Sequence, residues 1–531
     1  GTCHDAPAGH HSTSRYGCAG RHGGNHQHVP GDDEHYRQAD HDGAADYHGP
    51  ADYDGAADYH GPAHYDGCAH NHDHAADHHD RSADHHDHAD DDGDHGGGDL
   101  HFAHPADVVV HFPHGYYAGR ARSLHNAPGQ LDKHDVDHVS VAYLDHAGSA
   151  PLCAEAAAAM APWLVPGRTA NPSGSHWAAA EARQALDEAR DTVSGVLGTA
   201  PGDVVFTASG SEAATLAILG PLRAAPGAVV VASVEHHCVL RAARAAERAG
   251  TAEARVVAVG GDGTVDLSCL AKLLDEHVRV VSVQLVNNEV GVLQPFGDVA
   301  RLVRRRAPHA VVHTDAVQAA PWYDVAEMAR GADLITISAH KFGGPPGTGA
   351  LAFRRSVPVE PVVYGGPQER ERRAGTQAVA AVAGMAAALG AAASNRAAAS
   401  AHVRRLRDRL CTGLLDDIPG TRETAPGRDK APGHCHLLID GVESEALLVL
   451  LDAAGLAASA GAACASGAME PSHVLLAMGF EPTEALGALR LTLGPASTDD
   501  DVDFALREVP RAVAQLRAGG HRLARTMAAA R

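Results

Sequence analysis

Short apolar runs rich in β-branched residues alternate with longer stretches of helical character from about residue 143 onward. The stretch HWAAAEARQALDEARDTVSGVLG (176–198), rich in Ala, Arg and Glu, is typical of the helical parts. Alternating helices and buried strands predict an α/β fold with a largely parallel sheet. The six runs are DVVFTAS (203–209), AVVVASV (228–234), ARVVAV (254–259), VRVVSVQLV (278–286), AVVHTDAV (310–317) and LITISA (334–339).

The pattern changes after an alanine-rich helical stretch at about 378–410. Beyond it come the strand-like HCHLLID (434–440), the helical SEALLVLLDAAG (444–455) and the strand-like ALRLTLG (488–494). These elements predict a smaller α+β unit. We therefore expect a large domain over residues 139–395 and a small C-terminal domain over residues 396–531.

The first part of the chain has a different composition. Before Leu100 there is no Ile, Leu, Met, Phe or Trp. A segment without large apolar side chains cannot offset the entropy of ordering itself, so we expect residues 1–138 to be disordered. A six-residue unit repeats over residues 45–68 as ADYHGP, ADYDGA, ADYHGP and AHYDGC, and a His/Asp-rich stretch follows it.

This His/Asp-rich extension allows two interpretations. Imidazole and carboxylate groups are metal ligands, so chelation is the first. The second is a solvated extension without a function. We favour the second, because a structural metal site needs ligands held in fixed geometry and only composition supports the metal. We predict no metal site in the rest of the chain.

The formal net charge is −23 at pH 7, and it is unevenly distributed. Residues 1–100 hold 21 Asp and Glu against 4 Arg and no Lys, which makes −17 of this charge. An acidic chain is a poor partner for DNA or for an anionic membrane. No apolar run reaches the length of a membrane span, and no signal peptide is visible. With nine cysteines in no recognisable framework, the sequence predicts a cytoplasmic protein.

The segment SAHKFGGPPGTGALAF (338–353) contains a glycine-rich GPPGTG that is also typical of nucleotide-binding P-loops. A P-loop needs Lys and then Ser or Thr directly after its last glycine, because these two side chains hold the phosphates and magnesium. Here Ala350 and Leu351 follow Gly349, and the lysine, Lys341, lies before the glycines. The segment therefore needs another explanation.

Polar clusters directly follow several of the apolar runs, at the strand ends where ligands of parallel sheets collect. A lysine at such a strand end, Lys341, suits Schiff-base formation with an aldehyde cofactor, and pyridoxal phosphate is the candidate. Its ring nitrogen needs a carboxylate, its phenolic oxygen needs donors, and its phosphate needs a helix N-terminus. The candidate carboxylate is Asp315, and the candidate donors to the phenolic oxygen are Gln318 and Asn288. The candidate phosphate site consists of Gly210 and Ser211, with Ser338 and His340 completing it. Each alone is more often a turn former or a helix cap, so only the set indicates the cofactor.

Nine motifs in this order resemble those of one enzyme family. They are YLDHAGSAP, NPSGSH, EHHCVL, VNNEVGVLQP, HTDAVQ, SAHKFGGPPGTGAL, GGPQERERRAGT, GAACASGAMEPSHVL and LRLTLG. Through them, residues 143–505, about two thirds of the chain, resemble a group I cysteine desulfurase of the class V aminotransferase family. The resemblance implies the type I fold of pyridoxal-phosphate enzymes, a homodimer, and pyridoxal phosphate on Lys341.

The resemblance also implies a role for each matching residue. His236 stacks on the cofactor ring and can transfer protons, while Lys341 removes the α-proton of the substrate. Arg490, with Asn288, binds the L-cysteine substrate through its carboxylate. The remaining implied cofactor contacts are Asn288 and Gln318 at the phenolic oxygen, Asp315 at the ring nitrogen, and Gly210, Ser211, Ser338, His340 and the partner subunit's Thr376 around the phosphate.

Cys464 carries the distinctive chemistry that the resemblance implies. It lies in SAGAACASGAME, among residues too small to enclose it in a core. Its thiolate would attack the substrate sulfur, leaving alanine and a persulfide that is passed to a sulfur-acceptor protein for iron–sulfur clusters, thio-cofactors or tRNA. The other eight cysteines are expected to be packing residues. Of these, Cys238, beside His237, is the one candidate for another role.

Some positions depart from the family pattern. His146 stands where desulfurases usually have Asn, and YLDHAG resembles molybdenum cofactor sulfurases, which bears on substrate specificity at most. Pro367 replaces a glycine without changing the register of Thr376. Two alternatives stay open at this point. One is a selenocysteine lyase or another class V sulfurtransferase. In a lyase, Cys464 would be dispensable. The other is a metal-binding or scaffold protein with a degenerate catalytic domain.

Overall fold

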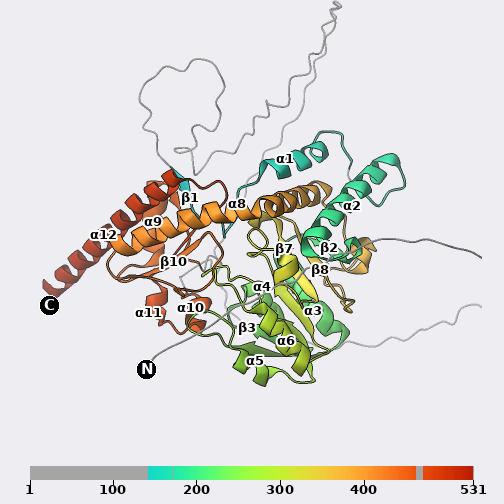
Figure 1. The fold of residues 1–531 in the computed structure, drawn as a ribbon, viewed down its shortest axis with the longest axis horizontal. Coiled ribbons are helices and arrows are strands. Elements are labelled where there is room, and N and C mark those ends of the chain that lie inside the picture. The colour runs from blue at the N-terminus through green and yellow to red at the C-terminus, as the bar shows by residue number, and fades with distance from the viewer. Residues whose placement is uncertain (1–140, 170, 462–469, 530–531) are drawn as a thin grey trace, which may run out of the picture. The chain divides into compact units, whose positions relative to one another are not determined.

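The computed structural model describes residues 141–169, 171–461 and 470–529, and its centre is a seven-stranded sheet (Figure 1). The strand order is β2-β8-β7-β6-β5-β3-β4. Neighbours from β7 to β4 pair in parallel, whereas β8 is antiparallel to both β7 and β2. The strands are β2 (Val204–Thr207), β3 (Gly227–Ala232), β4 (Ala252–Val257), β5 (Val278–Ser282), β6 (Val311–Asp315), β7 (Leu334–Ser338) and β8 (Gly349–Phe353).

The predicted α/β fold with a mostly parallel sheet is confirmed. Each of the six apolar runs overlaps one strand of this sheet. β8 was not among the predicted strands. It lies at the end of the glycine-rich segment 338–353, which was interpreted as a ligand-binding loop. It supplies the antiparallel part of the sheet.

Helices cover both faces of the sheet, as the twofold alternation of side chains along each strand requires. Val229 and Val231 belong to a core with residues of α3 (Gly210–Ala224) and α4 (His237–Arg248). Val230 points to the opposite face and belongs to the larger core. The sheet is therefore buried on both sides.

Helix α4 shows why the helices lie where they do. Its buried residues are Val239, Ala242, Ala243 and Ala246, which recur three and four positions apart on one face. His236 caps its first turn by accepting a hydrogen bond from the backbone N–H of Cys238 through Nδ1 (3.2 Å). The cap therefore fixes the His236 ring at the carboxyl end of β3.

The core on the face of Val230 also contains residues of α2 (Trp177–Leu197), α5 (Leu267–Leu273) and α6 (Phe296–Arg306). The other helices of this part are α1 (Ala154–Met160) and α7 (Val325–Met328), with 3-10 turns η1 (Ala161–Trp163), η2 (Pro201–Asp203), η3 (Ala339–Lys341) and η4 (Gln368–Glu371). Within the described ranges, none of the helices is both long and apolar enough to cross a lipid bilayer.

The longest helix of the described residues, α8 (Val379–Asp417), has 39 residues and joins the sheet region to the C-terminal elements (Figure 1). It packs against α1 and α2 at one end and against β9 (Thr421–Glu423) and β10 (His434–Ile439) at the other. The helix runs without a break through residue 395, where the sequence predicts the boundary between the two domains. The predicted domain limits stay predictions.

A second sheet forms the centre of the C-terminal elements, with the order β12-β10-β9 and antiparallel pairs. Its register places His436 opposite Arg490 of β12 (Ala488–Thr492). The short β1 (Ala142–Tyr143) pairs in parallel with β11 (Leu456–Ala457), so the start of the described chain lies beside the C-terminal elements. The other elements are α9 (Ser444–Ala454), α10 (His473–Ala477), α11 (Pro482–Ala485) and α12 (Asp499–Ala529).

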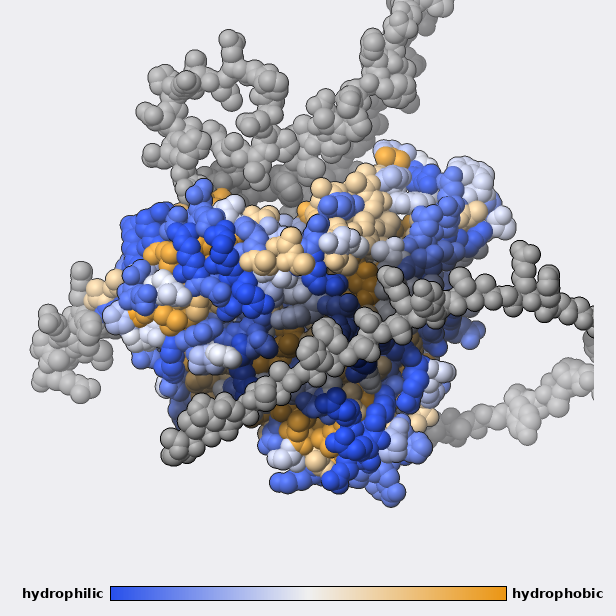
Figure 2. All heavy atoms as spheres, in the orientation of Figure 1, coloured by the Kyte–Doolittle hydropathy of each residue, from blue (hydrophilic) through white to orange (hydrophobic). Residues whose placement is uncertain are grey.

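The surface of the described residues is mostly hydrophilic in the view of Figure 2, with moderately hydrophobic residues gathered over the N-terminal half of α8. This matches its alanine-rich sequence, since Ala397 and Ala398 are exposed and Ala391 and Ala392 half-buried. The predicted disorder of residues 1–138 and the interpretation of their His/Asp-rich stretch lie outside the described residues.

A buried ion pair holds the loop before α8 against the sheet. Glu369, 5% exposed, receives hydrogen bonds from Arg190 (2.9 and 3.0 Å) and from the backbone N–H of Phe206 (2.9 Å). We expect Glu369→Ala to lower the free energy of unfolding by about 3–5 kcal/mol, because it leaves the Arg190 guanidinium buried without its counter-ion. Chemical denaturation would measure this. Glu371→Ala, at an exposed position of the same loop, is the control; equal effects of the two substitutions would contradict the prediction.

Candidate active site

The predicted cofactor residues lie at one edge of the seven-stranded sheet. Asp315 and Ser338 are the last residues of β6 and β7, and Lys341 ends the turn η3 directly after β7. His236 and Asn288 follow β3 and β5, and Gly210 opens the helix after β2. The carboxyl ends of neighbouring parallel strands meet at the same edge, which brings these residues together.

Lys341 is half-buried and its amine is held by main-chain oxygens. Its Nζ donates to the carbonyl oxygens of Ala147 and Gly148, both at 2.6 Å. Gln318 donates to the same Ala147 oxygen through Nε2 (2.9 Å). The segment 145–149 therefore lies directly against the reactive lysine, a contact that links residues almost 200 positions apart.

Asp315 is a buried carboxylate with a single backbone donor. Its Oδ1 accepts a hydrogen bond from the N–H of Val317 (2.9 Å), and the residue is 8% exposed. Burial raises the pKa of Asp315 to about 6, while the positive charge of Lys341 acts in the opposite direction. At neutral pH this carboxyl is ionised, and it can pair with a cationic ring nitrogen.

His236 is a neutral imidazole at neutral pH. Burial, followed by the positive charge of Lys341, lowers its pKa to about 4. Its Nδ1 also lies 3.0 Å from the Sγ of Cys238. Burial raises the pKa of this thiol well above its ordinary value, so Cys238 stays protonated and is a poor nucleophile.

The start of α3 and the end of β7 approach each other closely. A Cβ on Gly210 would lie 2.9 Å from the Cβ of Ser338, and a Cβ on Gly349 would lie 2.6 Å from the carbonyl carbon of Ser209. Only glycine fits at these two positions. Ser209 caps the helix by accepting from the N–H of Glu212 (3.1 Å). The last glycine of GPPGTG therefore serves close packing beside a helix N-terminus, which attracts anions.

Ser211 and His340 complete this anion-binding candidate. Ser211 is the second residue of α3, and its hydroxyl lies toward the Cys238 thiol, whose pKa it lowers. His340 Nδ1 lies 3.4 Å from the Oγ of Ser149. Burial, then Lys341, lowers the pKa of His340 to about 4, so this ring offers hydrogen bonds rather than charge at neutral pH.

Arg490 is buried in β12 and its guanidinium is already oriented. Nη2 pairs with Oδ1 of Asp145 (2.7 Å), and Nη1 donates to the main-chain oxygen of Asn288 (2.9 Å). Within the described part of the chain, Nε of Arg490 and Oδ1 of Asn288 are buried without a hydrogen-bond partner. A substrate carboxylate at Arg490 would therefore share it with Asp145, a residue that the sequence analysis did not single out although it lies in YLDHAGSAP.

Two predicted residues are not placed in this group. Thr376 is exposed, in the loop before α8. Arg373 of the same loop pairs with Glu212 in the first turn of α3 (2.8 Å). The role of Thr376 in a neighbouring subunit stays a prediction. Cys464 lies outside the described residues, and its role also stays a prediction.

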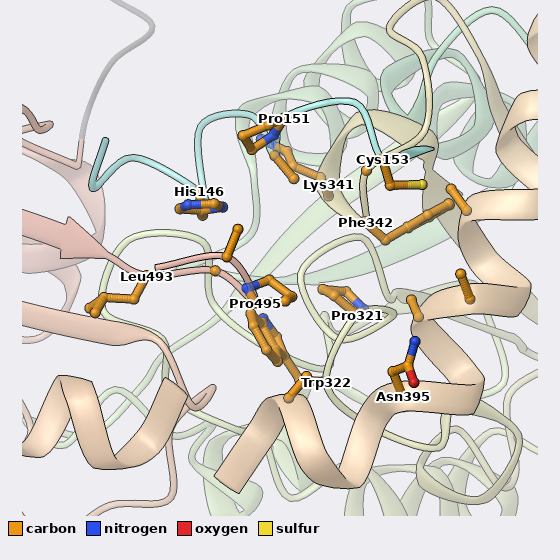
Figure 3. Close-up of a pocket in the computed structure, with 18 of the residues that line it drawn as sticks. His146, Pro151, Cys153, Pro321, Trp322, Lys341, Phe342, Asn395, Leu493 and Pro495 are labelled. Atoms are coloured by element: carbon orange, nitrogen blue, oxygen red, sulfur yellow. The ribbon is translucent and has the colours of Figure 1, made fainter. Parts of the chain in front are cut away.

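A cavity of about 330 Å³ opens beside Lys341. Figure 3 shows its lining of Lys341, Cys153, Phe342 and Trp322, together with His146 from the segment that also contacts the lysine. Burial lowers the pKa of His146 to about 4. Of the predicted site residues only Lys341 and Gln318 line this cavity, so it lies to one side of the lysine, away from Asp315 and His236.

Comparisons with known proteins agree with this geometry. The family model described as aminotransferase class-V matches residues 142–504. The IscS-like cysteine desulfurase of Mycobacterium tuberculosis is 39% identical over 386 residues, covering 71% of this chain and 97% of that relative. A cysteine desulfurase of Cereibacter sphaeroides is also 39% identical, over 71% of this chain and 96% of the relative.

Solved structures show the same likeness. The structure titled NifS-like protein has a TM-score of 0.66 and 29% identity, over 71% of this chain and 100% of that chain. The structure titled SspA in complex with cysteine has a TM-score of 0.58 and 26% identity, over 67% of this chain and 100% of that chain. With a family model that matches well over half of its residues, this chain belongs to the class V aminotransferase family and is homologous to cysteine desulfurases.

Proposed function

We propose that this chain is a pyridoxal-phosphate-dependent cysteine desulfurase, which converts L-cysteine to L-alanine and keeps the sulfur as a persulfide on Cys464. The observation that carries the proposal is the convergence of Lys341, the buried carboxyl of Asp315 and the ring of His236 at one edge of the sheet. The relatives named cysteine desulfurase and the structure of SspA with cysteine support L-cysteine as the substrate.

The residues present fit pyridoxal phosphate. Membership of the family implies this cofactor. Asp315 offers an ionised carboxylate to the ring nitrogen, and His236 offers an uncharged ring for stacking. The amide of Asn288 has a buried oxygen without a partner among the described residues, as expected of a side chain that binds an added group. Gly210 and Ser338 meet at a helix N-terminus suited to a phosphate.

Pyridoxal phosphate, when bound, supplies an electron sink that stabilises negative charge at the α-carbon of an amino acid. Lys341 would hold it covalently, and as a free amine it could accept the α-proton as a general base. His236 is uncharged at neutral pH, so it can accept a proton only transiently and returns it readily, because its pKa is lowered to about 4. Asp315 keeps the positive charge of the ring nitrogen in place.

Sulfur transfer needs a bound carboxylate and a thiolate. Arg490 holds the substrate carboxylate, which fixes the direction of the side chain. The Cys464 thiolate attacks the substrate sulfur, so that an S–S bond forms while the Cβ–S bond breaks. The electron pair of that bond stays with the carbon skeleton, which takes up a proton and leaves as alanine. No outside oxidant or reductant is required.

We further propose that the enzyme is a homodimer in which the partner subunit's Thr376 reaches the phosphate, and that a sulfur-acceptor protein takes the persulfide. Exposure of Thr376 supports the first part. The direct test of the function is mass spectrometry of the purified protein after addition of L-cysteine. One added sulfur on the peptide that contains Cys464, with alanine as product, is expected. An unmodified Cys464 during turnover would refute the persulfide.

Arg490→Lys is expected to raise the KM for L-cysteine by about 10- to 100-fold, with a smaller change in kcat. A lysine keeps the ion pair with Asp145 but lacks the paired N–H groups that match a carboxylate. Steady-state kinetics over a range of L-cysteine concentrations would measure this. Arg422→Lys, at a surface ion pair with Asp440, is the matched control. An unchanged KM for the Arg490 variant would show that the carboxylate binds elsewhere.

A further inference from the structure

A row of four buried polar side chains crosses the sheet next to Asp315. Ser282 lies at the end of β5, His313 in β6 and Thr336 in β7, and Glu235 follows β3. All four are 0% exposed. Ser282 Oγ lies 3.1 Å from Oε1 of Glu235 and 2.9 Å from Nδ1 of His313, whose Nε2 lies 3.0 Å from Oγ1 of Thr336.

The register of the strands places this row directly behind Asp315. His313 and Asp315 are two positions apart in β6, so their side chains share one face of the sheet. Thr336 is the neighbour of Asp315 in β7, and Ser282 is the neighbour of His313 in β5. The row is therefore the layer of polar groups beneath the predicted partner of the cofactor ring.

The hydrogen atoms in this row are limited. Burial lowers the pKa of His313 to about 3, so its ring is neutral and has one donor and one acceptor nitrogen. The Ser282 hydroxyl has one proton and lies between His313 and Glu235. If Glu235 were ionised, the Ser282 hydroxyl and the backbone N–H of Gln284 would both favour its charge, but its second oxygen, Oε2, has no hydrogen-bond partner among the described residues. An anion with an unpaired, fully buried oxygen is costly.

Charged neighbours add to this cost. Asp315 acts on Glu235 as a second carboxyl, and burial and this neighbour together raise the pKa of Glu235 to about 8. Other titratable groups also face Glu235 or its loop. They are His313 of β6, Lys341 beyond Asp315, and His236, His237 and Cys238 of the segment that contains Glu235. The last is His473 of α10, whose Nε2 lies 3.0 Å from the main-chain oxygen of Glu235. Of the two carboxyls, Asp315 ionises first and Glu235 keeps its proton.

We propose that Glu235 is a positioning residue for Asp315, which holds a proton at the end of the Glu235–Ser282–His313–Thr336 row and so leaves the negative charge to Asp315. The proposal rests on the proposed function only in naming the cofactor ring as the cation that Asp315 faces. A proton kept on Glu235 avoids two buried anions side by side. It also lets the carboxyl serve the row as an uncharged hydrogen-bonding group.

The test compares Glu235→Gln with the wild-type full chain by thermal unfolding between pH 5 and 9. Between pH 4.5 and about 8 the folded wild type holds a proton on Glu235 that the unfolded chain has released, so this group's contribution to stability falls as the pH rises. Glutamine has the same shape and no such proton. The Tm of the variant relative to wild type is therefore expected to rise with pH, by on the order of 5 °C, and to level off near pH 8. A difference that stays constant with pH overturns the proposal.

Asp315→Asn in both backgrounds tests the link between the two carboxyls. Without the charge of Asp315, the pH at which the difference levels off should move to a lower value. Glu289→Gln is the matched control, because Glu289 is also buried with a raised pKa but is influenced by Ser472, Arg490 and His237 rather than by Asp315. The Tm difference between Glu289→Gln and wild type should depend on pH in the same way with and without Asp315→Asn. If Asp315→Asn leaves unchanged the pH at which the Tm difference between Glu235→Gln and wild type levels off, the proposal is overturned.

If Glu235→Gln does not fold, Ser282→Ala gives the same information. The Ser282 hydrogen bond lowers the pKa of Glu235, so its loss should move the decline in wild-type stability to higher pH. If stability declines over the same pH range in Ser282→Ala as in wild type, the proposed link between Ser282 and the Glu235 proton is overturned. These measurements need no turnover, so they can fail while the desulfurase function holds, and they can succeed if the substrate proves to be different.

Discussion

Lys341→Ala is expected to lower the turnover of L-cysteine by about 10⁴-fold or more and to abolish covalent attachment of the cofactor. The change removes both the amine that forms the covalent bond and the base for the α-proton. The amine donates to the main-chain oxygens of Ala147 and Gly148, and the side chain lies at the edge of the sheet rather than in the apolar core, so the fold should survive. Borohydride reduction followed by peptide mass spectrometry would locate the attached cofactor, and an alanine assay would follow turnover.

The control for this experiment is Lys272→Ala, at an exposed lysine in the last turn of α5. It should retain both the attached cofactor and the wild-type rate. If the Lys341 variant still carried the cofactor covalently, another amine would be the attachment point. The assignment of the glycine-rich segment would then be wrong.

Cys464→Ser is expected to retain the cofactor and its visible absorbance while losing sulfur release from L-cysteine by about 10³-fold or more. A serine hydroxyl is far less acidic and less nucleophilic than a thiol, so the S–S bond cannot form. Sulfide release in the presence of a reducing thiol, and alanine production, would measure the loss. Spectra recorded with L-cysteine should still change, because the proposed contacts of the substrate are with Lys341 and Arg490 rather than with Cys464.

Cys153→Ser is the matched control for the thiol. Cys153 lines the cavity beside Lys341 and caps α1 by accepting from the N–H of Ala156 (3.4 Å), and serine can make the same cap. Its activity should match the wild type. Equal losses in both variants would point to a general effect of thiol removal, and retained turnover in Cys464→Ser would favour a lyase-like reaction.

The strands and the residues that follow them could be predicted from sequence because both are local features. β-branched runs indicate buried strands, and polar clusters such as NNEVG and HTDAVQ follow them directly. The structure confirms the fold and places Asp315, Lys341 and His236 at one sheet edge. Their chemical roles stay predictions until variants are measured.

The long-range contacts could not be predicted in this way. The contact of Lys341 with the segment 145–149 and the pairing of Arg490 with Asp145 join residues 193 to 345 positions apart. The row from Glu235 to Thr336 depends on β3 lying beside β5, and β5 beside β6, an order of strands that differs from their order in the chain. Periodicity indicates which residues are buried, but it does not indicate which buried residues meet.

The unbroken α8 has a mechanical consequence for the spacing between Lys341 and Arg490. A helix of 39 residues is about 58 Å long, so a tilt of about one degree at one end displaces the other by about 1 Å. One end packs against α1 and α2, and the other against β9 and β10, of which β10 pairs with β12 and places His436 opposite Arg490. Substitutions that bend this helix far from Lys341 and Arg490 should therefore change the KM for L-cysteine, if Arg490 binds its carboxylate as proposed, before they change the fold.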